Sequence, residues 1–207
     1  WLARAYFAAG TADLALPLLE PAAAAGNLLA LTILGDMLLG GTGVDAIRIT
    51  ANAPAPAWPA FKLQWLMEHD TQSVERAAHL LMPKDWINLN LTGLVAQDVT
   101  EASLSFLMDW RNQDWSARMR DLTGVPERLL PTLRMPADVL GPLTPAAAQA
   151  TGLPAGLPVL VGAGDYPMAL LGSGAIAAGT GSDVTGTSTI LTLIQPEPVI
   201  AGGISNV

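Results

Sequence analysis

A single aspartate, Asp165, follows an apolar segment that breaks into glycines, and it could act as a base. The apolar residues 157–161 predict a buried strand, and Gly162 and Gly164 lie between this strand and the aspartate. A carboxylate at the end of such a strand is held rigidly, while the small residues let another molecule approach closely. The alternative is a local role, in which Asp165 caps a helix predicted over 167–172. Glycines are costly at a strand end unless a close approach is needed, which favours the site.

A second polar turn lies further along the chain, at Gly186, Thr187 and Ser188. Residues 184–187 and 189–194 around it are expected to form one strand, or a pair of strands with a tight polar turn. Consecutive backbone N–H groups and hydroxyls in such a turn can bind an anion, although similar tripeptides are common in ordinary hairpins. The sequence has no P-loop of the form Gly-x-x-x-x-Gly-Lys-Ser/Thr. A base at one position and an anion-binding turn at another together suggest phosphoryl transfer.

The composition indicates a globular protein of one large or two small domains. Of its 207 residues, 51% are hydrophobic and 14% charged, and the formal net charge is −8. Scattered Lys and Arg do not favour nucleic acid as a partner. The chain has no cysteine, and His69 and His79 lack the spacing of a metal site, so no residue is assigned to a metal. The most apolar window, 28–39, is shorter than the roughly 20 residues that span a bilayer, so no membrane partner is expected and the protein is expected to be cytoplasmic.

Periodicity and capping residues predict a series of short helices. They cover residues 2–9, 28–39, 60–69, 71–81, 83–93, 114–124, 144–152 and 167–172. Thr71 is expected to cap the helix that follows it, and Thr144 with Pro145 begins another. Residues 98–108 are expected to form a polar cap followed by a helix or turn on the core.

Several residues that could carry chemistry are interpreted as structural. Four tryptophans at helical positions are expected in the core, namely Trp65, Trp86, Trp110 and Trp115. Lys62 and Lys84 are expected to lie along helix faces with their charges in water. Asp98 and Glu101 flank Thr100 in what is predicted to be a local helix cap.

Five segments, in order along the chain, carry a resemblance to a known family. Residues 59–66 read Pro-Ala-Phe-Lys-Leu-Gln-Trp-Leu, and 82–93 contain Met-Pro-Lys-Asp-Trp and then Leu-Thr-Gly. Residues 98–116 contain Asp-Val-Thr-Glu-Ala-Ser and then Asp-Trp-Ser. The turns 162–165 and 186–188 complete the series. Together the segments resemble the FGGY carbohydrate kinases, the group that includes xylulokinases and glycerol kinases.

The resemblance implies an α/β fold of the actin-like, ribonuclease-H-like type, with two domains and a cleft between them. Residues 46–172 would be the sugar-side domain, 173–207 the start of the ATP-side domain, and 1–45 a poorly matched part of the first domain. The implied reaction transfers the γ-phosphate of ATP, with Mg²⁺, to a hydroxyl of a sugar or polyol.

The resemblance also implies roles for individual residues. Asp165 would be the general base, and Gly186, Thr187 and Ser188 would contact the ATP phosphates. Gly164, Asp165 and Tyr166 would line the sugar side of the site. Tyr166 departs from the family, because xylulokinases have Asn and glycerol kinases have Gln after the base. The resemblance therefore does not identify the sugar substrate.

Two further departures limit the expected activity. The family's N-terminal Gly-x-Asp-x-Gly-Thr-x-Ser turn is absent from residues 1–45, and the adenine-binding part would lie beyond Val207. The chain is therefore expected to be a fragment that is inactive alone. A non-catalytic sugar-binding or regulatory relative and an actin-like ATPase without a sugar are the alternatives. The oligomeric state is open, with a homodimer as one option.

Overall fold

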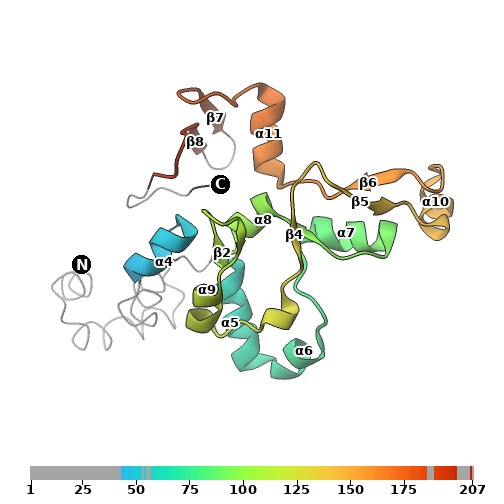
Figure 1. The fold of residues 1–207 in the computed structure, drawn as a ribbon, viewed down its shortest axis with the longest axis horizontal. Coiled ribbons are helices and arrows are strands. Elements are labelled where there is room, and N and C mark those ends of the chain that lie inside the picture. The colour runs from blue at the N-terminus through green and yellow to red at the C-terminus, as the bar shows by residue number, and fades with distance from the viewer. Residues whose placement is uncertain (1–42, 53, 55–56, 186–188, 200–205, 207) are drawn as a thin grey trace. The chain divides into compact units, whose positions relative to one another are not determined.

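The computed structural model describes residues 43–52, 54, 57–185, 189–199 and 206 (Figure 1). These residues form two compact units. The first contains the described residues of 1–77 together with 105–127. The second contains 78–104, the described residues of 128–201, and 206. The helices expected at 2–9 and 28–39 lie outside the described residues.

The first unit is mainly helical. Its helices are α4 (Gly43–Thr50), α5 (Pro59–His69), α6 (Thr71–Arg76) and α9 (Ala117–Thr123), and β2 (Met108–Asp109) pairs antiparallel with β3 (Asp114–Trp115). Phe106, Leu107 and Met119 are fully buried here. The ring of Phe61 lies 5.1 Å from that of Phe106, centroid to centroid. The N–H of Ala60 also donates to the carbonyl oxygen of Ser105 at 3.1 Å, so the segment before β2 fixes the start of α5.

The second unit mixes short helices with three two-stranded sheets. Its helices are α7 (Pro83–Thr92), α8 (Val99–Ser103), α10 (Pro145–Thr151) and α11 (Asp165–Ser173). The parallel pair is β1 (Gln97–Asp98) with β4 (Leu133–Arg134). The antiparallel pairs are β5 (Val139–Pro142) with β6 (Pro158–Leu160), and β7 (Gly181–Thr185) with β8 (Thr189–Leu193). A short 3₁₀ helix, η1 (Glu127–Leu129), precedes β4 in the chain.

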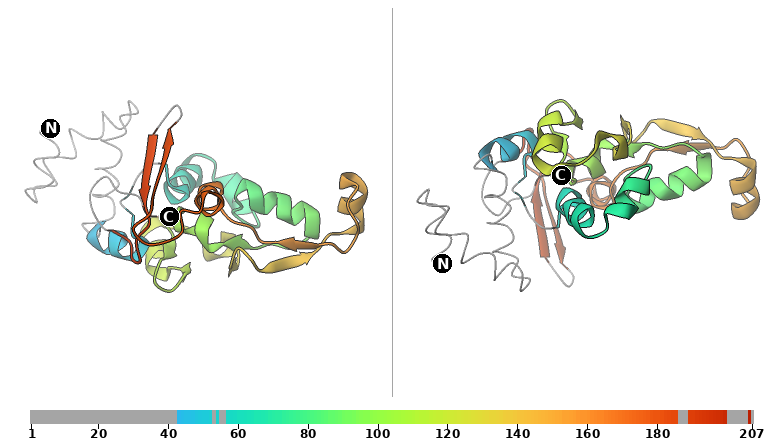
Figure 2. Two further views of the ribbon diagram at one scale, coloured as in Figure 1. Left: turned by 90° about the horizontal axis from the view of Figure 1, so that it is seen from above. Right: turned by 90° about the horizontal axis from the view of Figure 1, so that it is seen from below.

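Two small apolar clusters hold the part of this unit that carries the site. Ala96, Leu140 and Val161 form one of them, beneath the end of β6. Figure 2 shows β5 and β6 side by side, leading to α10, which connects them in the chain. There Leu143 and two alanines of α10 form the other cluster, with Leu91 of α7 packed against it. The α10 end of the β5–β6 ribbon is therefore packed against α7.

Local capping chemistry explains several predicted helices. The predictions over 60–69, 83–93 and 144–152 are confirmed by α5, α7 and α10. In α10 the side chain of Thr144 accepts from the N–H of Ala147, proline occupies the first turn, and Gly152 ends the helix at φ 74°. A left-handed residue at that position needs glycine, so the sequence fixes where this helix ends.

Two helix starts were predicted wrongly. Thr71 does not cap α6, because the side chain of Asp70 accepts from the N–H of Ser73 while Thr71 Oγ1 donates to the carbonyl oxygen of Met67. This helix also ends at Arg76, well before residue 81. The helix expected from Asp114 begins instead at Ala117 with Ser116 as its cap, because residues 114–115 pair with β2.

Burial corrects two more expectations. Trp65 and Trp86 are 57% and 60% exposed, so these two tryptophans do not belong to the core of the described structure. The indole of Trp65 instead stacks on the imidazole of His69, with centroids 4.4 Å apart. The strand ending near Val161 is also exposed over β6, because it pairs only with β5 in a two-stranded ribbon. Within the described segment 158–161, the strand residues of β6 are exposed or partly exposed and Val161, which follows them, is fully buried.

Among the described residues, no helix combines the length and apolar character that crossing a membrane requires.

Ser116 provides a test of the capping argument in the first unit. Its Oγ accepts from the N–H of Met119 at 3.2 Å. We expect Ser116→Ala to lower the free energy of unfolding by about 1 kcal/mol, because the N–H loses its partner, as measured by chemical denaturation. Ser116→Thr keeps the hydroxyl and should stay close to the parent. Equal losses in both variants would show that the cap is not the cause.

Candidate functional site

Asp165 is the first residue of α11 and its side chain is exposed. Gly164 is the N-cap, and no side chain caps this helix. One carboxylate oxygen of Asp165 accepts from the adjacent N–H of Tyr166 at 2.7 Å. The alternative in which Asp165 caps a helix starting at residue 167 is therefore wrong, since the helix begins at Asp165 itself. The carboxylate is left accessible at the N-terminal end of α11.

The two glycines before Asp165 serve different purposes. Gly162 has φ +78°, a backbone conformation that residues with a side chain rarely adopt. An added Cβ would lie 3.3 Å from Cδ of Lys84. Gly164 has φ −57°, and a Cβ there would meet its neighbours at ordinary distances of 3.5 Å or more. The turn thus needs glycine at 162 on conformational grounds. At 164 the N–H is the important group, and it donates to Oγ1 of Thr100 at 2.8 Å.

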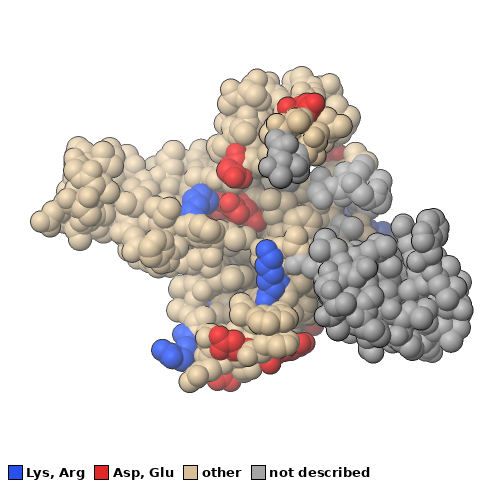
Figure 3. All heavy atoms as spheres, turned by 180° about the vertical axis from the view of Figure 1, so that it is seen from behind, with Lys and Arg blue, Asp and Glu red and all other residues tan. Residues whose placement is uncertain are grey.

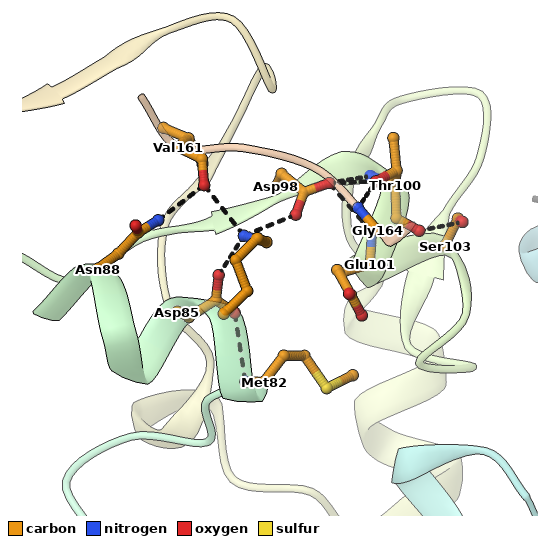
Figure 4. A network of polar contacts seen from close by, with 10 residues as sticks. Met82, Asp85, Asn88, Asp98, Thr100, Glu101, Ser103, Val161 and Gly164 are labelled. Atoms are coloured by element: carbon orange, nitrogen blue, oxygen red, sulfur yellow. Dashed lines mark hydrogen bonds and ion pairs between the residues drawn. The ribbon is translucent and has the colours of Figure 1, made fainter. Parts of the chain in front are cut away.

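Lys84 joins the loop before Asp165 to two other elements, and its partners Asp85, Asp98 and Val161 are labelled in Figure 4. Its Nζ lies 2.6 Å from Oδ1 of Asp85, 3.0 Å from Oδ2 of Asp98 and 3.1 Å from the carbonyl oxygen of Val161. Asn88 Nδ2 donates to the same carbonyl at 2.7 Å. The start of α7, the β1–α8 junction and the loop after β6 therefore meet around one ammonium group.

Asp98 has two functions in this network. Its Oδ1 accepts from the N–H groups of Thr100 and Glu101 and from the hydroxyl of Thr100, so the predicted local cap is confirmed. Its Oδ2 is buried and lies 3.0 Å from the ammonium of Lys84, which supplies the compensating charge. The cap is thus also half of an ion pair, which sequence alone did not indicate.

The expectation that Lys84 extends its charge into water is wrong. Its side chain is 22% exposed, and those of both carboxylate partners are 0% exposed. Burying two carboxylates without a cation costs a large amount of free energy, and the Lys84 ammonium lowers this cost by lying between them. The adjacent Lys84 and Asp85 are the only sequence signal for a buried ion pair here. They do not indicate that Val161, 77 residues away, also accepts from Lys84.

The pKa values in the network reflect this balance. Burial alone would lower the pKa of Lys84, but the hydrogen bonds and charges of Asp85 and Asp98 outweigh burial, and the pKa is raised. Burial raises the pKa of Asp85, and Lys84 together with the N–H of Met82 offsets only part of that rise. The ammonium of Lys84 therefore remains charged, whereas burial of the ionised Asp85 carboxylate costs free energy that Lys84 offsets only in part.

Negative charge also gathers beside the candidate base. Burial raises the pKa of Glu101, and the charges of Asp98, Asp85 and Asp165 add to this against the opposing effect of Lys84. Figure 3 shows basic side chains beside acidic ones on the face in view, within a mostly uncharged surface. Glu101 thus lies within electrostatic range of Asp165 and of the two buried carboxylates, with Lys84 as the opposing charge.

Tyr166 is half-buried, and its hydroxyl is hydrogen-bonded to Oγ1 of Thr192 on β8. The structure thus brings the start of α11 close to the β7–β8 hairpin. Strand pairing there runs to Thr185 and Thr189. The predicted strand at 189–194 is confirmed by β8, whereas β7 begins at Gly181, three residues before the predicted strand. Gly186, Thr187 and Ser188 themselves lie outside the described residues.

Within the described part of the chain, no three His, Asp or Glu side chains are grouped so as to hold a metal ion.

Comparisons with known proteins identify the class of protein. Residues 41–172 match the N-terminal domain of the FGGY family of carbohydrate kinases. An autoinducer-2 kinase of Klebsiella pneumoniae subsp. pneumoniae is 34% identical over 126 residues, which cover 61% of this chain and 24% of that protein. An L-fuculokinase of Escherichia coli strain K12 is 39% identical over 115 residues, or 56% of this chain and 24% of that protein. The matched part thus spans about a quarter of the length of each of these relatives.

A solved structure agrees with these matches. The xylulose kinase from Rhodospirillum rubrum superposes with a TM-score of 0.68 at 28% identity, covering 72% of this chain and 30% of that kinase. This chain belongs to the FGGY family of carbohydrate kinases. It carries part of the actin-like ATPase fold, as the resemblance implied.

Removing the ammonium group tests the network. We expect Lys84→Met to lower the free energy of unfolding at neutral pH by about 3 kcal/mol, because two buried carboxylates lose their cation. A carboxyl whose pKa is higher in the folded state stabilises that state at low pH, and this contribution disappears as pH rises through the folded pKa. The loss should therefore shrink near pH 4, which denaturation curves at both pH values would measure.

Lys62→Met is the matched control, because Lys62 is an exposed lysine on α5. It should leave the free energy of unfolding close to that of the parent at both pH values. Adding Asp85→Asn to Lys84→Met removes one buried charge and should recover part of the loss. Equal effects of the two lysine variants would contradict the network.

Proposed function

We propose that the protein carrying this chain phosphorylates a hydroxyl of a sugar or polyol at the expense of ATP, with Asp165 as general base. The observation that carries this proposal is the accessible carboxylate of Asp165 at the start of α11, directly after a glycine turn. The matched relatives are kinases for small sugars or for autoinducer-2, which supports the reaction class. The chain covers only about a quarter of their length, so the activity belongs to the whole protein.

Asp165 is suited to take a proton from an alcohol. Its carboxylate accepts the proton of the sugar hydroxyl as that oxygen attacks the γ-phosphorus of ATP. The bond from this phosphorus to the oxygen bridging to the β-phosphate breaks, and ADP leaves. The carboxylate of such a base must lie within hydrogen-bond distance of the hydroxyl and point toward it. A residue in the first turn of a helix has a fixed backbone, which limits the directions in which its side chain can point.

The phosphate side of the site is proposed at Gly186, Thr187 and Ser188. These residues connect β7 and β8, whose ends are paired up to Thr185 and Thr189. A turn of this composition can present N–H groups and hydroxyls to phosphate oxygens. Mg²⁺ would arrive bound to the ATP phosphates, the usual arrangement in kinases, and would neutralise charge there. Residues 173–207 would then begin the ATP-side domain, after a sugar-side domain that includes 46–172.

The sugar side is proposed to include Gly164 and Tyr166 beside Asp165. Tyr166 is half-buried, and its hydroxyl is already bonded to Thr192. The aromatic ring, rather than the hydroxyl, would then face the sugar. A ring in place of the amide of xylulokinases narrows the pocket and removes a hydrogen-bonding group, so the preferred sugar is expected to differ from xylulose.

Asp165→Asn tests the base. We expect kcat to fall by about 10²- to 10⁴-fold with sugar binding retained, because the amide cannot accept the proton. A coupled assay of sugar-dependent ADP release in the full-length protein measures kcat, and calorimetry measures sugar binding. Asp121→Asn is the control, since Asp121 is exposed on α9, outside the unit that holds Asp165.

The same assay separates the alternatives. A parent protein that binds sugar but releases no ADP with any pentulose, tetritol or glycerol would be a non-catalytic relative. ATP turnover that does not depend on an added sugar would indicate an actin-like ATPase. Either result would overturn the proposed function.

Tyr166→Asn tests the sugar side. We expect the ratio of kcat/KM between xylulose and the parent's preferred sugar to shift by about tenfold or more toward xylulose, because the pocket regains an amide. The KM for ATP should change little by comparison. A uniform loss for every sugar would contradict a role of Tyr166 in choosing the substrate.

A further inference from the structure

The hydroxyl of Thr100 connects the buried ion-pair network to the residue next to Asp165. It donates its proton to Oδ1 of Asp98 and accepts the N–H of Gly164 at 2.8 Å (Figure 4). A hydroxyl has one proton and two lone pairs, so the bond to Asp98 uses its only proton, and a lone pair accepts the N–H of Gly164. The acceptor at Asp98 is fixed because the whole side chain is buried and its other oxygen faces Lys84.

The position of Gly164 gives this contact its importance. Gly164 is the N-cap of α11, and Asp165 is the next residue. The other end of the loop is held at Val161, whose carbonyl accepts from both Lys84 and Asn88. Between these two points lies Gly162, whose backbone is in the left-handed region. A glycine-containing loop is thus tied at both ends to α7 and α8, immediately before the candidate base.

We propose that Thr100 is a positioning residue for Asp165, acting through the N–H of Gly164. This inference rests on the proposed function, because it assigns Asp165 a chemical task. Without the hydroxyl, α11 still forms, since its own hydrogen bonds and Gly174 at its end remain. Its first turn, however, loses the bond that sets the direction of the Asp165 carboxylate. A base misplaced by about 1 Å costs catalysis far more than it costs binding.

The experiment compares three variants of the full-length protein. Thr100→Val keeps the shape of the side chain and loses both hydrogen bonds, and Thr100→Ser keeps both bonds. Thr144→Val is the matched control, because Thr144 Oγ1 likewise accepts a backbone N–H, that of Ala147 in α10, away from Asp165. We expect kcat to fall by about 10- to 100-fold in Thr100→Val with sugar and ATP KM within about threefold of the parent.

Thr100→Ser should recover kcat to within about threefold of the parent, and Thr144→Val should leave kcat unchanged while lowering the melting temperature. If Thr100→Val and Thr144→Val lose stability alike and both keep kcat, the inference is wrong while the proposed function stands. If Asp165→Asn keeps full activity, the proposed function is wrong.

Hydrogen exchange gives a readout that does not require activity. Peptides covering 162–168 should exchange faster in Thr100→Val than in the parent or in Thr100→Ser. The same peptides should be unaffected by Thr144→Val. Unchanged exchange over 162–168 in Thr100→Val would overturn the inference even if the sugar substrate is still unidentified.

Discussion

The ammonium group of Lys84 is the interaction on which the candidate site depends. Two carboxylates, Asp85 and Asp98, are fully buried within reach of it, and burying two such groups without a cation beside them would cost a large amount of free energy. The same nitrogen donates to the carbonyl of Val161, which begins the loop leading to Asp165. One charge therefore holds together three segments that are distant in sequence, and the ion pair selects a single arrangement of them.

Much of the local structure could be predicted, because its causes are local. Proline at the start of α7 and α10, Thr144 as a cap and Gly152 at φ 74° are all within one turn of the helix ends that they determine. Lys84 could not be placed in the same way. Its neighbours in sequence indicate an exposed helix start, and only Asp98 and Val161, brought in by folding, draw it inward.

The backbone around Asp165 was predicted in outline and corrected in detail. Asp165 does follow an apolar segment and a glycine turn, yet its strand is an exposed ribbon and α11 begins two residues earlier than expected. Strand burial depends on how many strands pair, which a single apolar run does not reveal. Thr100 was seen only as part of a cap, because its bond to Gly164 spans 64 residues. The roles of residues 186–188 remain predictions.

The hydrogen bonds that tie the loop at 161–164 also bear on the order of events during folding. They link residues separated by 64, 73 and 77 positions, whereas the caps of α7 and α10 link near neighbours. Contacts of high sequence separation form slowly, because a long stretch of chain must be closed before they contribute. During synthesis, α7 and α8 emerge long before Gly164. The loop at 161–164, which contacts Lys84, Asn88 and Thr100, is therefore absent when these helices first form. The loop before Asp165 is therefore expected to reach its final position late, after α7 and α8, which hold it.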